Sequence, residues 1–113
     1  MLAQFVQEGS DIDHVPAADV AAGSVVVQGD LVGVAQRDIK AGELGSLTVG
    51  EAVFDLPKAT TAGSAIPAGS KVFWDAANKL AKTDDGGGAN KYLGKTILAA
   101  ADADATVRVR LQQ

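Results

Sequence analysis

The sequence predicts a single all-β domain. Its 113 residues include 13 glycines spread among turn signals, which is typical of many short strands joined by tight connections. Nearly half of the residues are apolar but only five are aromatic, so the core must be built from Val, Leu, Ile and Ala. A chain of this length supports one hydrophobic core and is too short for two.

The first elements are short. Residues 2–7 alternate loosely and fit either a first strand or an extended arm, and turn-forming residues follow at 8–11. Residues 11–15 are confined by Pro16 to a sheet edge or a strand end, because proline cannot donate to a ladder. Residues 17–22 have the composition of a helical turn but are too short for a helix that is stable alone.

The β signal is strong from residue 24. The runs 25–27 and 31–35 are rich in valine and flank Gln28-Gly29-Asp30, which predicts a tight hairpin with Gly29 at positive φ. Consecutive valines favour strands that are buried on both faces. Residues 38–45 are expected to form a loop.

A change of phase marks the middle of the chain. Leu47 and Val49 share one face of a strand, whereas Phe54 and Leu56 have the opposite parity. A period of two shifts phase only through an extra residue, so residues 50–51 are predicted to form a β-bulge. Pro57 closes this strand, and the small polar residues 60–64 predict a surface loop.

The second half continues with short strands. Residues 72–75 predict one, and residues 75–82 fit either a short helix or a hairpin; we favour the hairpin, with its turn at 76–78. A glycine-rich loop at 84–90 and a strand at 92–99 follow. The cleanest alternation is at 106–111, with Val107, Val109 and Leu111 facing in and Arg108 and Arg110 facing out.

An Ala-Gly dipeptide precedes an apolar strand three times, ending at Gly23, Gly42 and Gly69. The spacings differ, so we interpret these dipeptides as recurrent turns and not as a solenoid repeat.

Charge and composition exclude several classes of function. The formal charge of −4 argues against docking on nucleic acid or on an anionic membrane, which need a cationic footprint. The chain has no cysteine, no apolar run long enough to span a bilayer, and no export signal in its first residues. We expect a soluble module made in the cytosol.

No residue pattern predicts an active site, and we expect no enzyme, metal or cofactor. The segment from Gly88 to Gly94-Lys95-Thr96 resembles a phosphate-binding loop, but the gap between the glycines is five residues and not four, and no parallel α/β core surrounds it. Asp11 and Asp13 beside His14 lack the further ligands of a transition-metal site. A Ser-His-Asp triad would lack a nucleophile elbow.

Two adjacent aromatic residues suggest a contact surface. Phe73 and Trp74 must point to opposite faces of their strand, so both cannot fill one core. We expect one of them to lie at a subunit contact or under a loop. Arg108 and Arg110 are expected to lie on a solvated outer face.

Several phrases resemble a known family when they are read in order: VQEGS at 6–10, GDLVGVA at 29–35, VFDLPKA at 53–59, GSKVFWD at 69–75 and VRVRL at 107–111. They are similar to small proteins encoded beside major capsid genes in tailed phages and prophages. That family was long described as of unknown function, and some members carry a RecA/RadA recombinase label. The resemblance covers nearly the whole chain.

The resemblance implies a capsid decoration (cement) protein with a small antiparallel β-barrel or β-tulip-like fold. It implies homotrimers on the virion head surface, bound to the major capsid protein, with synthesis in the bacterial host cytoplasm and no catalytic residues. Residues 1–9 are our hypothesis for a capsid-contacting arm, and the contact candidates are Leu2, Phe5, Val6, Phe73 and Trp74. The alternative is another phage structural or binding module, such as a head-fibre base or a carbohydrate-binding domain.

Overall fold

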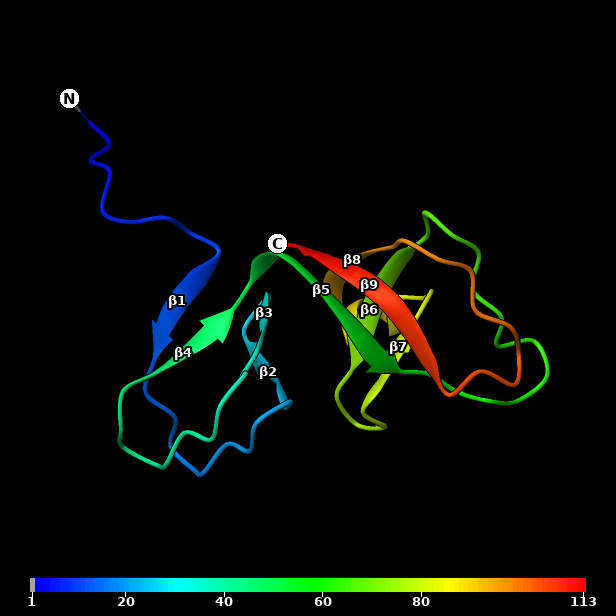
Figure 1. Cartoon of the computed structure of the whole chain (residues 1–113), viewed down its shortest axis with the longest axis horizontal. Coiled ribbons are helices and arrows are strands. Elements are labelled where there is room, and N and C mark those ends of the chain that lie inside the picture. Colours follow the sequence, from blue (N-terminus) through cyan, green and yellow to red (C-terminus); the bar gives the residue numbers. More distant parts are fainter. Residues whose placement is uncertain (1) are drawn as a thin grey trace.

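The structure, a computed structural model, describes residues 2–113 and confirms the all-β class. Two antiparallel sheets lie next to one another (Figure 1). The four-stranded sheet has the order β1-β4-β3-β2 and is made of β1 (Asp11–His14), β2 (Val25–Gln28), β3 (Leu31–Val34) and β4 (Gly45–Thr48). The five-stranded sheet has the order β5-β9-β8-β6-β7 and is made of β5 (Gly50–Pro57), β6 (Lys71–Asp75), β7 (Leu80–Lys82), β8 (Lys91–Thr96) and β9 (Thr106–Gln112).

The chain passes between the two sheets at the predicted change of phase. β4 ends at Thr48 in one sheet and β5 begins at Gly50 in the other. The pairing of β5 with β9 shifts register between Gly50 and Val53, and Glu51 has a φ of 57°. The bulge is therefore confirmed. Its position at the crossing between sheets was not apparent from the sequence, because a phase shift alone does not say which strand each half pairs with.

A shared core joins the sheets. Val32 and Val34 of β3 pack in one cluster with the inner residues of the five-stranded sheet, including Leu93 and Val109, which are fully buried. A smaller cluster beneath the four-stranded sheet contains Ala35, Ile39, Leu47 and Val49. Burial of these side chains is the main source of stability. Within residues 2–113 the sheets stay open and no closed barrel forms.

Both predicted hairpins are present. β2 and β3 are joined at Gly29, which has a φ of 60°, and β6 and β7 pair across the turn that follows Asp75. Burial on both faces holds for β3 but is wrong for β2, where Val27 is 36% exposed. The reason is that β2 is an edge strand. The three Ala-Gly turns are also confirmed, with φ of 85° at Gly23, 78° at Gly42 and 76° at Gly69.

The sequence leaves two segments open. Residues 2–9 form no strand, which leaves the extended arm of the two alternatives. Residues 17–22 form no helix, and Val20 instead exchanges two backbone hydrogen bonds with Ile39, at 2.7 and 2.8 Å. β8 ends at Thr96, three residues early, and the chain then turns so that Ala100 bridges Ile66. The glycine-rich loop contains a short 3₁₀ helix, η1 (Gly86–Gly88). No helix in the described part of the chain is long and apolar enough to cross a membrane.

Two polar ties hold the sheets together. The Gln113 amide accepts a hydrogen bond from the Val32 N–H (2.9 Å) and donates one to the Leu93 carbonyl (3.0 Å), so it bridges β3 and β8. Lys91 of β8 forms an ion pair with Asp30, at 2.9 Å, in the turn between β2 and β3. This contact holds the pKa of Asp30 below its usual value, through the hydrogen bond from Lys91 and its charge.

Candidate interaction surfaces

An exposed arm precedes the first strand. Leu2, Phe5 and Val6 are 106%, 81% and 86% exposed, and the arm extends away from both sheets (Figure 1). The arm is attached to the fold at Ser10, beside the point where the chain crosses between the sheets. There the Ser10 carbonyl accepts hydrogen bonds from the Val49 N–H (2.8 Å) and, more weakly, the Gly50 N–H (3.3 Å). The arm therefore starts from a fixed point of the fold and presents three large apolar side chains to solvent.

Apolar side chains that are exposed together point to a partner. Surface hydrophobic residues scattered singly need no explanation, whereas a cluster on a segment that adds nothing to the core is typical of an interaction site. Leu2, Phe5 and Val6 lie within five residues of one another and outside both core clusters. These three are contact residues predicted from the sequence, and the structure leaves all of them exposed.

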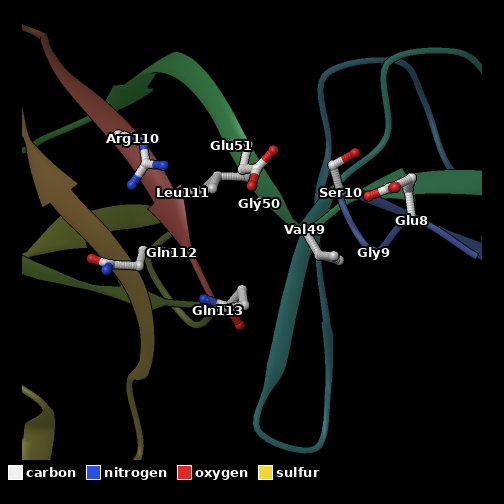
Figure 2. Close-up of a pocket in the computed structure, with 10 residues that line it drawn as sticks. All are labelled: Glu8, Gly9, Ser10, Val49, Gly50, Glu51, Arg110, Leu111, Gln112 and Gln113. Atoms are coloured by element: carbon white, nitrogen blue, oxygen red, sulfur yellow. The ribbon is translucent and has the colours of Figure 1, made fainter. Parts of the chain in front are cut away.

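A polar cleft lies between residues 8–10, where the arm joins the fold, and the end of β9. It has a volume of about 330 Å³ and is lined by Glu8 to Ser10, Val49 to Glu51 and Arg110 to Gln113. Figure 2 shows Arg110 and Glu51 on neighbouring strands, with Glu8 and Ser10 on the opposite side of the cleft. The charges are mixed, and the lining contains no Cys, His or Lys that could act as a nucleophile or as a base near neutral pH.

Phe73 and Trp74 take different positions. Trp74 is 5% exposed and packs in the shared core. Phe73 is half-buried on the outer face of the five-stranded sheet, where its ring meets that of Tyr92 edge to face at 5.7 Å. With Lys71, Lys95 and Gln112, the two rings line a shallow groove of about 440 Å³. Phe73 is the member of the pair that remains open to a contact.

The two outward arginines of β9 have different surroundings. Arg108 forms a two-point ion pair with Asp55 on the neighbouring strand, at 2.9 and 3.2 Å. The hydrogen bonds and charge of Arg108 hold the pKa of Asp55 below its usual value. Arg110 makes no such ion pair with any described residue.

A third ion pair organises the turn between β6 and β7. Lys82 contacts the Asp75 carboxylate at 2.8 Å, and the Asn78 side chain donates to the same oxygen, also at 2.8 Å. The hydrogen bond from Lys82, assisted by Asn78, places the pKa of Asp75 far below its usual value. The carboxylate also accepts the backbone N–H groups of Ala77 and Asn78, which is how it fixes the turn.

One buried cation was not predicted as a feature of the fold. Lys58 follows β5 and is only 3% exposed, and its ammonium donates to the carbonyls of Ala59 (2.7 Å), Ala101 (2.9 Å), Asp104 (3.1 Å) and Asp102 (3.2 Å). It thereby joins the loop after β5 to the loop before β9. The only sequence signal is a lysine directly after the proline that ends a strand, which is too common to identify such a site.

The candidate chemical motifs have structural roles. Gly94-Lys95-Thr96 lies on β8 and not in a loop, and the Thr96 hydroxyl donates to the Pro67 carbonyl at 2.7 Å. Asp11 accepts a hydrogen bond from the Thr48 hydroxyl at 2.7 Å on the edge strand β1. Within residues 2–113, no group of three or more His, Cys, Asp or Glu side chains could hold a metal ion.

Comparison with known proteins gives a family match. The family model described as phage cement protein matches residues 6–111, nearly the whole chain. No curated protein matches, and no solved structure matches.

Proposed function

Since this chain belongs to the phage cement protein family, we propose that it binds the outer surface of a tailed-phage or prophage head, in contact with the major capsid protein. The observation that carries the proposal is the family match over residues 6–111. The chain is made in the host cytoplasm and then resides on the virion. Its role is structural, and it performs no catalysis.

The arm of residues 1–9 makes the contact with the capsid. Three exposed apolar side chains on a segment outside the core support this assignment. An extended segment can add a strand to an exposed sheet edge, which gives affinity through backbone hydrogen bonds and specificity through alternate side chains. Such a contact needs no special chemistry, in keeping with the lack of reactive groups along the arm.

The protein acts as a homotrimer. The half-buried Phe73 on the outer face of the five-stranded sheet is the residue that we assign to a subunit contact. Phe73 and Tyr92 expose part of a large apolar surface there, and aromatic residues are enriched at the centres of protein interfaces.

Removal of the arm tests the capsid contact. The variant that lacks residues 1–7 keeps the anchoring Ser10, so it should fold as the full chain does but fail to co-sediment with capsids that lack the protein. The triple variant Leu2→Ser with Phe5→Ser and Val6→Ser should weaken binding at least about 100-fold, because each large apolar side chain contributes about 1.5–3 kcal/mol when buried. The matched control is Val15→Ser with Ile97→Ser and Leu98→Ser, three residues that are 57%, 45% and 54% exposed outside the arm. Full binding by the truncated protein would refute the assignment of the arm.

A further inference from the structure

Three cations lie side by side on the outer face of the five-stranded sheet. Lys71 of β6 is directly opposite Lys95 of β8, and Lys95 is directly opposite Arg110 of β9. All three are exposed. Neighbouring strands are about 4.8 Å apart, so the row spans roughly 10 Å. We call Lys71, Lys95 and Arg110 the basic row.

No member of the basic row has an ion-pair partner among the described residues, although Arg110 lines the polar cleft together with Glu8 and Glu51. Like charges directly opposite one another on a sheet are destabilising, so such a row weakens the fold unless something else compensates for it. The ion pairs of the described residues involve Lys82, Lys91 and Arg108, and none includes a member of the row. On the same face, Arg108 is neutralised by Asp55. The row is therefore suited to an acidic surface that is brought by a partner.

The opposite charge is concentrated in the other half of the same chain. Residues 1–49 contain seven acidic side chains against two basic ones, whereas residues 50–113 contain seven acidic and eight basic. The net charge of −4 thus arises from a four-stranded half at −5 and a five-stranded half at +1. A second copy of the chain therefore carries an acidic half that is complementary in charge to the basic row.

The four-stranded sheet offers a groove of the right character. Asp11, Asp13 and Asp38 line it, with a single cation, Arg37, and its volume is about 620 Å³. Asp11 and Asp13 are two residues apart on β1, so they point to the same side, about 7 Å apart, which is comparable to the length of the basic row. We call this the acidic groove.

An apolar contact lies beside each charged surface. Phe73 and Tyr92 border the basic row in the groove that they form with Lys71 and Lys95. Leu44 is 69% exposed and lines the acidic groove. An apolar anchor surrounded by complementary charges is the usual arrangement of a specific protein interface.

From these observations we propose that the basic row of one copy docks into the acidic groove of the next copy, head to tail. The two surfaces are different patches of one chain, so the contact is heterologous, and a ring closes when the rotation between copies allows it. The proposal rests on the homotrimer proposed above and names the surfaces that form it. A nucleic acid is a poor occupant, because three cations on an acidic protein make a small footprint for a phosphate backbone.

Charge reversal tests the contact. Lys95→Glu with Arg110→Glu reverses the row, and Asp13→Lys with Asp11→Asn reverses the groove while keeping an oxygen for the Thr48 hydroxyl. Sedimentation velocity at low and high salt should show that the wild-type protein self-associates, and that association weakens as salt rises. Each reversed variant alone should associate at least about 100-fold more weakly, because like charges then face each other across the interface.

The variant that carries all four substitutions is the decisive one. Its row is acidic and its groove is basic, so its self-association should recover toward that of the wild-type protein. The matched control is Lys40→Glu with Lys79→Glu, two exposed lysines that lie in neither surface and whose substitution makes the same change in net charge as reversal of the row. This control should associate like the wild-type protein.

The contradicting results are separate from those that test capsid binding. A wild-type protein that is monomeric at every concentration and salt, or a four-substitution variant that stays as dissociated as either parent, would overturn the proposal. Row reversal that leaves the oligomer intact but abolishes capsid binding would instead assign the basic row to the capsid. Normal self-association without any capsid binding would refute the proposed function but support the head-to-tail contact.

Discussion

The buried ammonium of Lys58 makes a strong prediction about stability. The substitution Lys58→Met keeps most of the side-chain volume but removes the donor that joins the loop after β5 to the loop before β9. We expect the fold to persist and its free energy of unfolding to fall substantially. The reason is the set of carbonyl groups that lose their partner.

The magnitude follows from which carbonyls depend on Lys58 alone. The Ala101 carbonyl also accepts the Asp104 N–H, so it keeps a donor. The Asp102 carbonyl shares the single hydrogen of the Ser64 hydroxyl with the Thr61 carbonyl, so it keeps a partial donor. The carbonyls of Ala59 and Asp104 have Lys58 as their donor within the described residues. An unsatisfied buried acceptor costs about 1–3 kcal/mol, so the upper bound for two is roughly 6 kcal/mol. Both carbonyls belong to loops that water can reach in part, and we expect a loss of about 2–4 kcal/mol.

Urea unfolding measures this loss directly. Trp74 is the only tryptophan and is buried in the shared core, so its fluorescence reports on the folded state. Lys40→Met is the matched control, since Lys40 is exposed and should change stability by less than about 0.5 kcal/mol. If the free energy of unfolding of Lys58→Met lies within about 0.5 kcal/mol of the wild-type value, the carbonyl groups do not depend on Lys58 for their satisfaction.

Three further predictions concern the sheets. In Gly94→Ala the new Cβ would lie 2.0 Å from the Arg110 carbonyl oxygen. We therefore expect β8 and β9 to separate and the free energy of unfolding in urea to fall by at least about 3 kcal/mol. The control is Gly50→Ala, whose new Cβ has nothing within 4 Å and which should cost much less. Trp74→Ala empties part of the shared core and should lower the free energy of unfolding by about 3–5 kcal/mol. Urea unfolding monitored by circular dichroism measures this loss, and a value below about 1 kcal/mol would contradict the place of Trp74 in the core. The folded-state pKa of Asp75 is lowered, so its contribution to folding stability is present above about pH 4 and is lost as the pH falls through the folded-state pKa. Asp75→Asn should therefore flatten the fall in stability below about pH 4. An unchanged dependence of stability on pH in this range would contradict the ion pair.

The sequence was sufficient to predict most of the strands. Alternation at β9, the hairpin at Gly29 and the phase shift at residues 50–51 are local patterns, and the structure confirms each of them. They were predictable because side-chain parity and turn chemistry act over a few residues. β8 was predicted too long, because its end is set by the bridge between Ala100 and Ile66, a contact distant in sequence.

The division into two open sheets was beyond local patterns. Nothing near Val49 says that the strands before and after it belong to different sheets, since pairing depends on partners far along the chain. The contact surfaces also depend on residues that are far apart in the sequence. The basic row combines residues from three strands, and Lys58 collects carbonyls from loops more than 40 residues apart. Local patterns predicted only parts of these surfaces: an arm as one of two alternatives at residues 2–7, and the opposite orientation of Phe73 and Trp74.

Electron cryomicroscopy shows whether this chain decorates a phage head. The specimens are capsids from the phage or prophage that encodes it, assembled without the chain and then incubated with an excess of the purified protein. We predict ordered density for the two sheets on the outer capsid surface, with the arm of residues 1–9 in contact with the major capsid protein. Capsids that remain bare at saturating protein concentration would show that the chain does not decorate that head.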